Sequence, residues 1–535
     1  MKPVHTSGDL FKGTFILAIA AIVTKILSAI YRVPFQNIVG DIGFYIYQQV
    51  YPFYGIILVL STYGFPVVIS KLYAEQAALK ANKDIQNLFV IAAFILAIIG
   101  FIGFSVLFWG ADRLAAGMND PQLAVLLRVV AVGFLIFPIV SIFRGFFQGR
   151  GDMVPTAVSQ VGEQLVRVVT ILLAAFLLVS EGHSLYIVGG GALFGAITGG
   201  FAGSLILITF FYLKQRRKLP SFIEIDFKKS GKIAKALVIQ GFAICISSLV
   251  LIFIQLADSL NLYSLLLSSG FEAEQAKELK GVYDRGQPIV QLGMVVATSM
   301  SLSLVPLISK EKMKKQAAFL QDKIRLALQI AILIGAAATV GLWMIMKPAN
   351  IMLFENSSGS DVLSVLSILI LLSSMIITIT AILQGLGFIQ YPAFVIVFGF
   401  VFKYGLNILL VPLYGTIGAA IASCIALGTV LLLLVIKLKK CLEISLISMR
   451  FLVVIALAAA IMAIVLQLYL GATGLFGVFA HNRLYAGFQA LTAVAIGGFI
   501  YLYIVFKGNT FKEEELALLP FGSKLMFLLP KDNRR

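Results

Sequence analysis

The chain has 535 residues, of which 60% are hydrophobic and only 13% are charged, and its mean hydropathy is +0.99. Soluble domains contain roughly one-quarter charged residues, so this composition excludes a soluble globular protein. The net charge of +17 could indicate a nucleic-acid partner, but the basic residues are spread over short loops without interleaved aromatic residues. We therefore expect an integral membrane protein that binds no nucleic acid.

Apolar runs recur along the whole chain, each with about the 20 residues that a helix needs to cross ~30 Å of hydrocarbon. None shows the period-two alternation of a membrane barrel strand. The sequence therefore predicts an all-α fold with about fourteen transmembrane helices. They lie near residues 12–32, 43–70, 88–109, 123–147, 156–180, 186–213, 236–262, 283–309, 323–346, 361–383, 392–413, 415–438, 451–470 and 486–507.

The basic residues lie mostly on one side of these predicted helices. Of the 42 Lys and Arg residues, 30 fall in the N-terminus, the even-numbered loops and the tail, and 5 fall in the opposite loops. Cytoplasmic loops carry the excess of positive charge, so we expect both termini to be cytoplasmic. The remaining basic residues, 7 in number, lie within or at the ends of the spans.

The sequence offers no chemistry of its own for catalysis or metal binding. Its three cysteines and three histidines are scattered, without CxxC spacing, and it has no phosphate-binding GxxxxGK[ST] loop. We expect no metal, no cofactor and no enzymatic activity.

An internal repeat organises the chain. Four sequence matches occur at offsets of 236 to 240 residues, which predicts two halves of six helices each. Because six is an even number, both halves would have the same orientation in the membrane, as parallel repeats that enclose a central cavity. The matches are Gln148-Gly149 with Gln384-Gly385, Arg167 with Lys403, Pro52 with Pro288, and residues 65–71 with 305–310. The predicted parts are six-helix bundles at 1–220 and 221–440, two further helices at 441–510, and a cytoplasmic tail at 511–535.

Charged residues inside the spans are the candidates for function, because an uncompensated ion at the bilayer centre costs at least ~2.5 kcal/mol. Glu163 and Arg167, four residues apart, are expected to pair, with Lys403 as the repeat mate of Arg167. Three cations have no partner at helical spacing on their own helices: Lys25, Arg32 and Arg285. Asp258 and Asp284 could neutralise any of these three, or the cations could line a cavity that receives a phosphate-bearing anion.

Two stretches carry a family resemblance. YDRGQPIVQLG, followed by VATSMSLSLVPLISK, resembles the eighth helix of the lipid II flippase and stage V sporulation protein B branches of the multidrug/oligosaccharidyl-lipid/polysaccharide exporter superfamily. TKILSAIYRVPFQNIVG resembles their first helix. The resemblance implies a bacterial plasma-membrane flippase that moves undecaprenyl-pyrophosphate-linked sugars to the outer leaflet by alternating access. It also implies a substrate site of Lys25 and Arg285, with Asp284 orienting Arg285.

The chain departs from the lipid II branch in the second helix, where YIYQQVYPFYGIILVLSTYG lacks the Asp and Arg often found there. Lys25 also replaces an Arg of many relatives and loses its planar fork. A polysaccharide or spore-wall precursor therefore remains open as the substrate. Two other functions stay as alternatives: a drug or organic-cation exporter of the same superfamily, and a membrane-embedded glycosyltransferase or polymerase.

The expected partners are a lipid-linked oligosaccharide and membrane lipids, with the cell-wall synthesis machinery as a further candidate. The sequence leaves open the glycan, the lipid carrier, the energy source and the oligomeric state.

The charge asymmetry generates a test of topology. In a cysteine-free background, cysteines that replace Gly182 or Gly359 should react with an impermeant thiol reagent added to intact cells, because both lie in loops opposite the N-terminus. Cysteines that replace Lys218 or Lys314 should stay unlabelled until the cells are opened. Labelling of the Lys314 position from outside would reverse the assigned orientation.

Overall fold

The computed structural model describes residues 7–79, 82–214, 227–295, 317–442, 447–474 and 482–508, nearly all of which are helical and none of which form a strand. The elements are α1 (Ser7–Ile30), α2 (Arg32–Val59), the π-helical turn η1 (Leu60–Gly64), α3 (Phe65–Ala78), α4 (Asn82–Gly117), α5 (Leu123–Ala131), α6 (Gly133–Gly149), α7 (Val154–Ser180), α8 (Leu185–Lys214), α9 (Phe227–Ser248), α10 (Val250–Ser268), α11 (Ala273–Asp284), α12 (Gly286–Gly293), α14 (Ala317–Phe354), α15 (Ser360–Gly385), α16 (Gln390–Leu442), α17 (Met449–Gly474) and α18 (Arg483–Lys507).

Twelve helical stretches of the described residues are long and apolar enough to cross a membrane. Two of them, Ile16–Ala78 and Gln390–Leu442, have 63 and 53 residues, far more than one crossing needs. Gly40 (φ 69°) and Gly415 (φ 58°) interrupt them with left-handed backbone that glycine adopts without a steric penalty. Each stretch therefore holds two spans, and the prediction of an all-α, multi-pass membrane protein is confirmed.

The predicted helix 236–262 is wrong as a single element. The structure has two helices there, α9 and α10, because Leu249 leaves the helical conformation with φ −91° and ψ 9°. The second half of the predicted span 283–309, including the VPLISK match at 305–310, lies outside the described residues.

Contacts between residues divide the chain into two compact units. Unit 1 comprises Met1–Asp284 and Phe388–Ala422, and unit 2 comprises Arg285–Gly387 and Ser423–Arg535. The boundary thus falls between Asp284 and Arg285, the two adjacent charges of the eighth-helix motif. The four-part division at residues 220, 440 and 510 stays a prediction.

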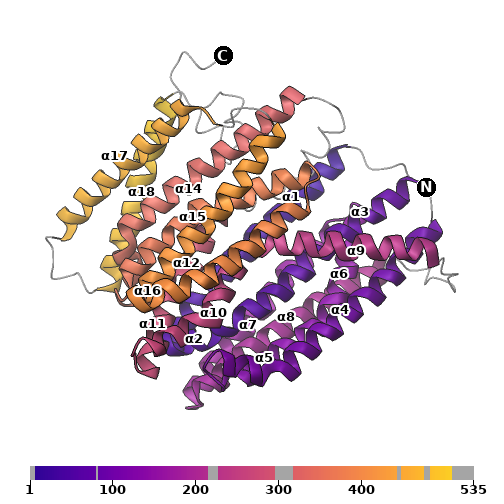
Figure 1. Ribbon diagram of the computed structural model, residues 1–535, viewed down its shortest axis with the longest axis horizontal. Helices are drawn as coiled ribbons and strands as arrows, with labels where there is room; N and C mark the ends of the chain where they lie inside the picture. The colour runs from indigo at the N-terminus through magenta and orange to yellow at the C-terminus, as the bar shows by residue number, and fades with distance from the viewer. Residues whose placement is uncertain are drawn as a thin grey trace. The chain divides into compact units, whose positions relative to one another are not determined.

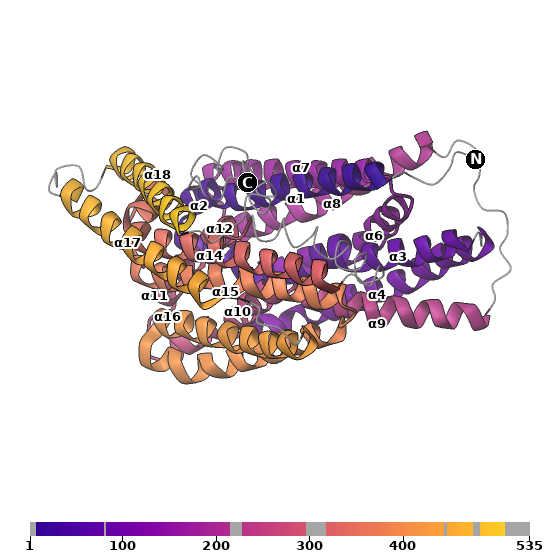
Figure 2. The same ribbon diagram turned by 90° about the horizontal axis from the view of Figure 1, so that it is seen from above.

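Within unit 1, α7 and α8 run side by side over most of their lengths (Figures 1 and 2). The glycines of α8 recur every four residues, which predicts a close approach of a neighbouring backbone. A side chain at Gly195 would meet the Arg167 carbonyl at 3.0 Å, and one at Gly199 would meet the Glu163 carbonyl at 2.7 Å. This predicted packing is confirmed, and it fixes the charged turns of α7.

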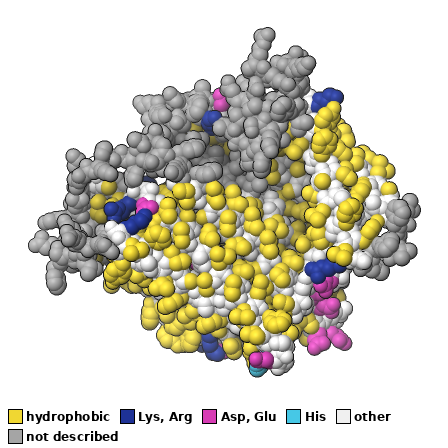
Figure 3. Space-filling view, turned by 180° about the vertical axis from the view of Figure 1, so that it is seen from behind, with side chains coloured by type: hydrophobic (Ala, Val, Ile, Leu, Met, Phe, Trp, Pro, Cys, Tyr) yellow, Lys and Arg dark blue, Asp and Glu magenta, His cyan; other side chains and the backbone are white. Residues whose placement is uncertain are grey.

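Within unit 2, α14 packs against α15 and against the paired helices α17 and α18 (Figure 1). Buried Tyr501 of α18 donates a hydrogen bond of 2.9 Å to the Leu333 carbonyl of α14. On the molecular face shown in Figure 3, hydrophobic side chains form a broad expanse, and the charged side chains lie at its margins. This distribution suits contact with lipid.

The packing of α11 on α2 in unit 1 generates a stability prediction. A Cβ at Gly281 would lie 2.1 Å from the Asp41 carbonyl oxygen, so Gly281→Ala must push the two helices apart. We expect a loss of about 1–3 kcal/mol, measured as a lower melting temperature of the purified protein in detergent. Gly190→Ala is the matched control, because a Cβ there meets nothing within 4 Å. Equal melting temperatures for the two variants would contradict the contact.

Candidate functional site

A row of tyrosines marks one face of α2. Tyr47, Tyr51 and Tyr54 follow the i, i+4, i+7 spacing that places side chains on one side of a helix, and all three are buried. The break at Gly40 turns the chain back on itself, so that Tyr31, which precedes α2, meets this row. The hydroxyls of Tyr31 and Tyr47 lie 2.8 Å apart.

Arg32 lies against this tyrosine face. Its side chain is fully buried, and its guanidinium carbon lies 4.3 Å from the centre of the Tyr51 ring and 5.9 Å from that of Tyr31. Cation–π attraction stabilises this position. None of its three guanidinium nitrogens has a hydrogen-bond partner among the described residues.

Arg167 of α7 approaches the same tyrosines from another helix. Its guanidinium carbon lies 6.0 Å from the centre of the Tyr31 ring and 5.0 Å from that of Tyr54, and it donates a hydrogen bond to the Tyr54 hydroxyl. Two of its nitrogens, Nε and Nη2, have no partner in the described part of the chain. The structure therefore gathers Arg32 and Arg167 around the Tyr31 ring.

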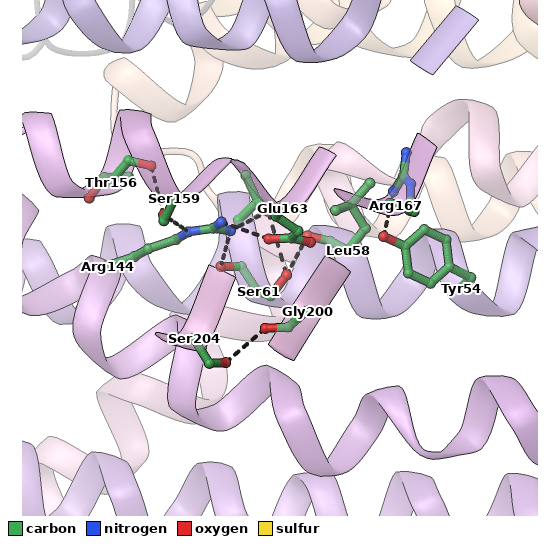
Figure 4. A network of polar contacts seen from close by, with 11 residues as sticks. Tyr54, Leu58, Ser61, Arg144, Thr156, Ser159, Glu163, Arg167, Gly200 and Ser204 are labelled. Carbon is green, nitrogen blue, oxygen red and sulfur yellow. Dashed lines mark hydrogen bonds and ion pairs between the residues drawn. The ribbon is translucent and has the colours of Figure 1, made fainter. Parts of the chain in front are cut away.

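The predicted pairing of Glu163 with Arg167 is wrong. Glu163 instead accepts a hydrogen bond of 2.8 Å from Arg144 of α6, while Arg167 is directed to Tyr54 (Figure 4). Arg144 is fully buried. Tertiary packing of α6 on α7 thus overrides the spacing of four residues within α7.

The π-helical turn η1 completes the surroundings of Arg144. Arg144 donates hydrogen bonds to the Thr62 hydroxyl at 3.0 Å and to the Ser159 hydroxyl at 3.2 Å. Every guanidinium nitrogen of Arg144 therefore has an acceptor. Because its charge is also neutralised by Glu163, we assign Arg144 a structural role.

Lys25 belongs to α1, which packs along α7 in unit 1. Its side chain is half-buried and makes no hydrogen bond or ion pair with any described residue. Like Arg32 and Arg167, it lies within a span of unit 1 and has no acidic partner in the described ranges.

The buried carboxylates differ from these three cations, because each has a cationic neighbour. Among the described residues four carboxyl side chains are buried. Their ion pairs are Asp120 with Lys277 (3.8 Å), Glu163 with Arg144 (2.8 Å), Asp258 with Lys403 (2.9 Å) and Asp284 with Lys280 (2.6 Å). The unneutralised charge buried in unit 1 is therefore positive.

Asp258 and Lys403 form the centre of a separate polar cluster in unit 1. Asp258 accepts hydrogen bonds of 2.9 Å from Tyr283 and from Asn407, and Lys403 also donates to the Ala419 carbonyl at 2.6 Å. Removal of either charge would leave its partner buried and uncompensated. This geometry favours a structural role for Asp258 and Lys403.

Arg285, the first residue of unit 2, is fully buried. It donates hydrogen bonds to Asn356 at 2.7 Å and to Asn350 at 3.3 Å, and it lies 5.2 Å from the centre of the Phe354 ring. Asn350, Asn356 and Phe354 are all uncharged side chains. The adjacent Asp284 is held by Lys280.

The sequence reasoning grouped Arg167 with the structural or repeat-paired charges, because Glu163 four residues earlier suggested a local pair. It also missed the tyrosines, although their i, i+4, i+7 spacing in a membrane helix was readable. Lys280 and Asp284 are likewise four residues apart, which is a signal for the pair that the structure contains. The pairing of Arg144 with Glu163 has no such local signal.

Comparison with known proteins gives the family. Residues 10–312 match the family described as polysaccharide biosynthesis protein. The uncharacterized membrane protein YabM of Bacillus subtilis is 44% identical over 96% of both chains. The lipid II flippase MurJ of the same organism is 27% identical, over 93% of this chain and 95% of its own.

A solved structure shares the fold. The lipid II flippase MurJ in an inward closed conformation superposes with a TM-score of 0.64 at 17% identity, over 92% of this chain and 97% of that one. At this identity the likeness concerns the fold alone. The match over residues 10–312 establishes that the chain belongs to the polysaccharide biosynthesis protein family.

Proposed function

We propose that the protein is a flippase that moves an undecaprenyl-(pyro)phosphate-linked cell-wall or polysaccharide precursor from the cytoplasmic to the outer leaflet by alternating access. One observation carries the proposal: two buried guanidinium groups, of Arg32 and Arg167, meet around Tyr31 with free donor atoms and no carboxylate among the described residues. A guanidinium fork matches phosphate oxygens, and tyrosine hydroxyls can donate to them as well.

The chemistry of such a lipid explains why it needs a protein. Its prenyl chain is as apolar as the bilayer and can stay in lipid, whereas its phosphate and sugar lose their hydration if they cross hydrocarbon unaided. A buried positive site replaces water as the partner of the phosphate. The cost of burying Arg32 and Arg167 is then offset whenever an anion is bound.

An organic-cation exporter is the alternative. It would require a buried carboxylate free to bind a cation, and each buried carboxylate of the described residues has a cationic neighbour. Uptake of a lipophilic cation such as tetraphenylphosphonium by proteoliposomes distinguishes the two. Transport of the cation without flipping of a phosphate-linked lipid would favour the alternative.

We also propose that the protein lies in the bacterial plasma membrane with both termini in the cytoplasm. The cell-wall synthesis machinery is its proposed partner. The excess of basic residues on the N-terminal side supports the orientation. The polysaccharide biosynthesis family of residues 10–312 supports the substrate class.

The first functional prediction concerns Arg167. In proteoliposomes with a fluorescent undecaprenyl-pyrophosphate-linked sugar, Arg167→Ala and Arg32→Ala should each lower the flipping rate at least about tenfold, the effect of losing one charged hydrogen bond. Protein yield should stay normal, because removal of an unneutralised buried charge relieves a burial cost.

Arg128→Ala serves as the matched control. Arg128 is also an arginine of unit 1, but its side chain is 38% exposed and its ion-pair partner is the exposed Asp112. Its replacement should leave flipping unchanged. Wild-type flipping by both Arg167→Ala and Arg32→Ala would refute the anion site.

The second functional prediction concerns Arg285. If Arg285 binds the anionic headgroup, Arg285→Ala should abolish complementation of a strain that lacks the protein, while the protein level stays normal. Arg285→Lys keeps the charge but loses the planar fork, so partial activity would indicate charge attraction and none would indicate a bidentate contact. Normal complementation by Arg285→Ala would remove Arg285 from the site.

A further inference from the structure

The turn after α4 fixes a carboxylate at one end of unit 1. Asn119 has a left-handed backbone conformation (φ 57°). The Asn119 amide donates a hydrogen bond to the Ala116 carbonyl, and the Asp120 amide donates one to the Ala115 carbonyl. These two bonds are a Schellman motif, and Pro121 prevents the helix from continuing. Asp120 therefore has a rigid backbone, and its side chain is only 4% exposed.

Three side chains from different helices meet at this carboxylate. Asp120 accepts a hydrogen bond of 2.7 Å from Tyr186 of α8 and one of 3.1 Å from Tyr45 of α2. Lys277 of α11 donates a hydrogen bond of 2.8 Å to the Tyr186 hydroxyl and lies 3.8 Å from the carboxylate. Its ammonium also lies 6.0 Å from the centre of the Tyr263 ring.

This cluster connects the two halves of the predicted repeat. Asp120, Tyr186 and Tyr45 belong to the first predicted half, residues 1–220, whereas Lys277 and Tyr263 belong to the second, residues 221–440. The cluster lies where α4 ends and α8 begins, which is the end of the helices opposite to the N-terminus of α1. In the proposed orientation this is the outer end.

The position of α11 also affects the predicted substrate residues. α11 lies against α2, with Gly281 at the Asp41 carbonyl, and its last residue is Asp284. Arg285 follows directly as the first residue of unit 2. A displacement of α11 must therefore move the backbone of Arg285 through a single peptide bond.

We propose that Asp120, Tyr186 and Lys277 form an outer latch, with Lys277 as the positioning residue that holds α11 against the first-half helices until the outer end opens. The inference rests on the alternating access of the proposed function but not on its substrate. Lys277 is the one charged residue of α11 in this latch, so opening breaks a single charged contact. Its side chain is 20% exposed, so water can solvate the ammonium group when the contact opens.

The experiment measures opening directly. A reporter cysteine replaces Gln48, which is 5% exposed and lies one turn beyond Tyr45 on α2, in a background with Cys245, Cys424 and Cys441 changed to serine. An impermeant maleimide is added to intact cells. Lys277→Met and Tyr186→Phe should each raise the labelling rate about tenfold, as expected for the loss of one charged hydrogen bond, and Lys277→Arg should restore the slow rate.

Arg128→Met is the matched control, because it removes a cation in unit 1 that pairs with Asp112 outside the latch. A cysteine at the exposed Gly182 gives the reference rate for free outer access. Unchanged labelling in both Lys277→Met and Tyr186→Phe would overturn the latch. If Lys277→Met lowers the protein level, Tyr186→Phe decides alone, because it keeps the ring and removes only the hydroxyl.

The labelling assay contains no added substrate. If the substrate assignment is wrong, flipping will be absent while Lys277→Met and Tyr186→Phe still speed labelling. If the latch is wrong, labelling will not change while Arg32→Ala and Arg167→Ala still lower the flipping rate. Loss of flipping in Lys277→Met without faster labelling would also overturn the latch, since it would indicate contact with the substrate.

Discussion

Buried positive charge without a neutralising carboxylate is the constraint around which unit 1 is organised. Among the buried cations of the described residues, only Arg32 and Arg167 have guanidinium nitrogens without acceptors. Their positions depend on two backbone features. The break at Gly40 turns α2 back so that Tyr51 faces Arg32, and the glycines of α8 admit the turns of α7 that carry Arg167.

The sequence predicted the features that follow from local pattern and from hydrophobicity. The membrane class follows from apolar runs, and the close approach of a neighbouring backbone to α8 follows from glycines every four residues. Charge pairing was predicted less well, because it is decided by which helices become neighbours. Glu163 had a local candidate in Arg167, yet α6 brings Arg144 within 2.8 Å of the Glu163 carboxylate.

The break between α9 and α10 was missed for a related reason. No proline marks Leu249, and the apolar pattern continues through it, so neither hydrophobic period nor a helix-breaking residue signals the interruption. The residue pairs 280/284 and 163/167 have the same spacing, but only the first forms an ion pair. Spacing of four residues makes a pair possible, and the competing neighbours on other helices decide whether it forms.

The use of tyrosine around Arg32 and Arg167 has a consequence for transport. A carboxylate at the position of Tyr51 or Tyr54 would neutralise the guanidinium, and an anionic substrate would have to displace it. A tyrosine ring stabilises the cation through its π-face without cancelling the charge, and its hydroxyl can accept from arginine or donate to phosphate. In the proposed mechanism the empty site is therefore positive, and binding and release of the anion do not require an internal ion pair to be broken and remade.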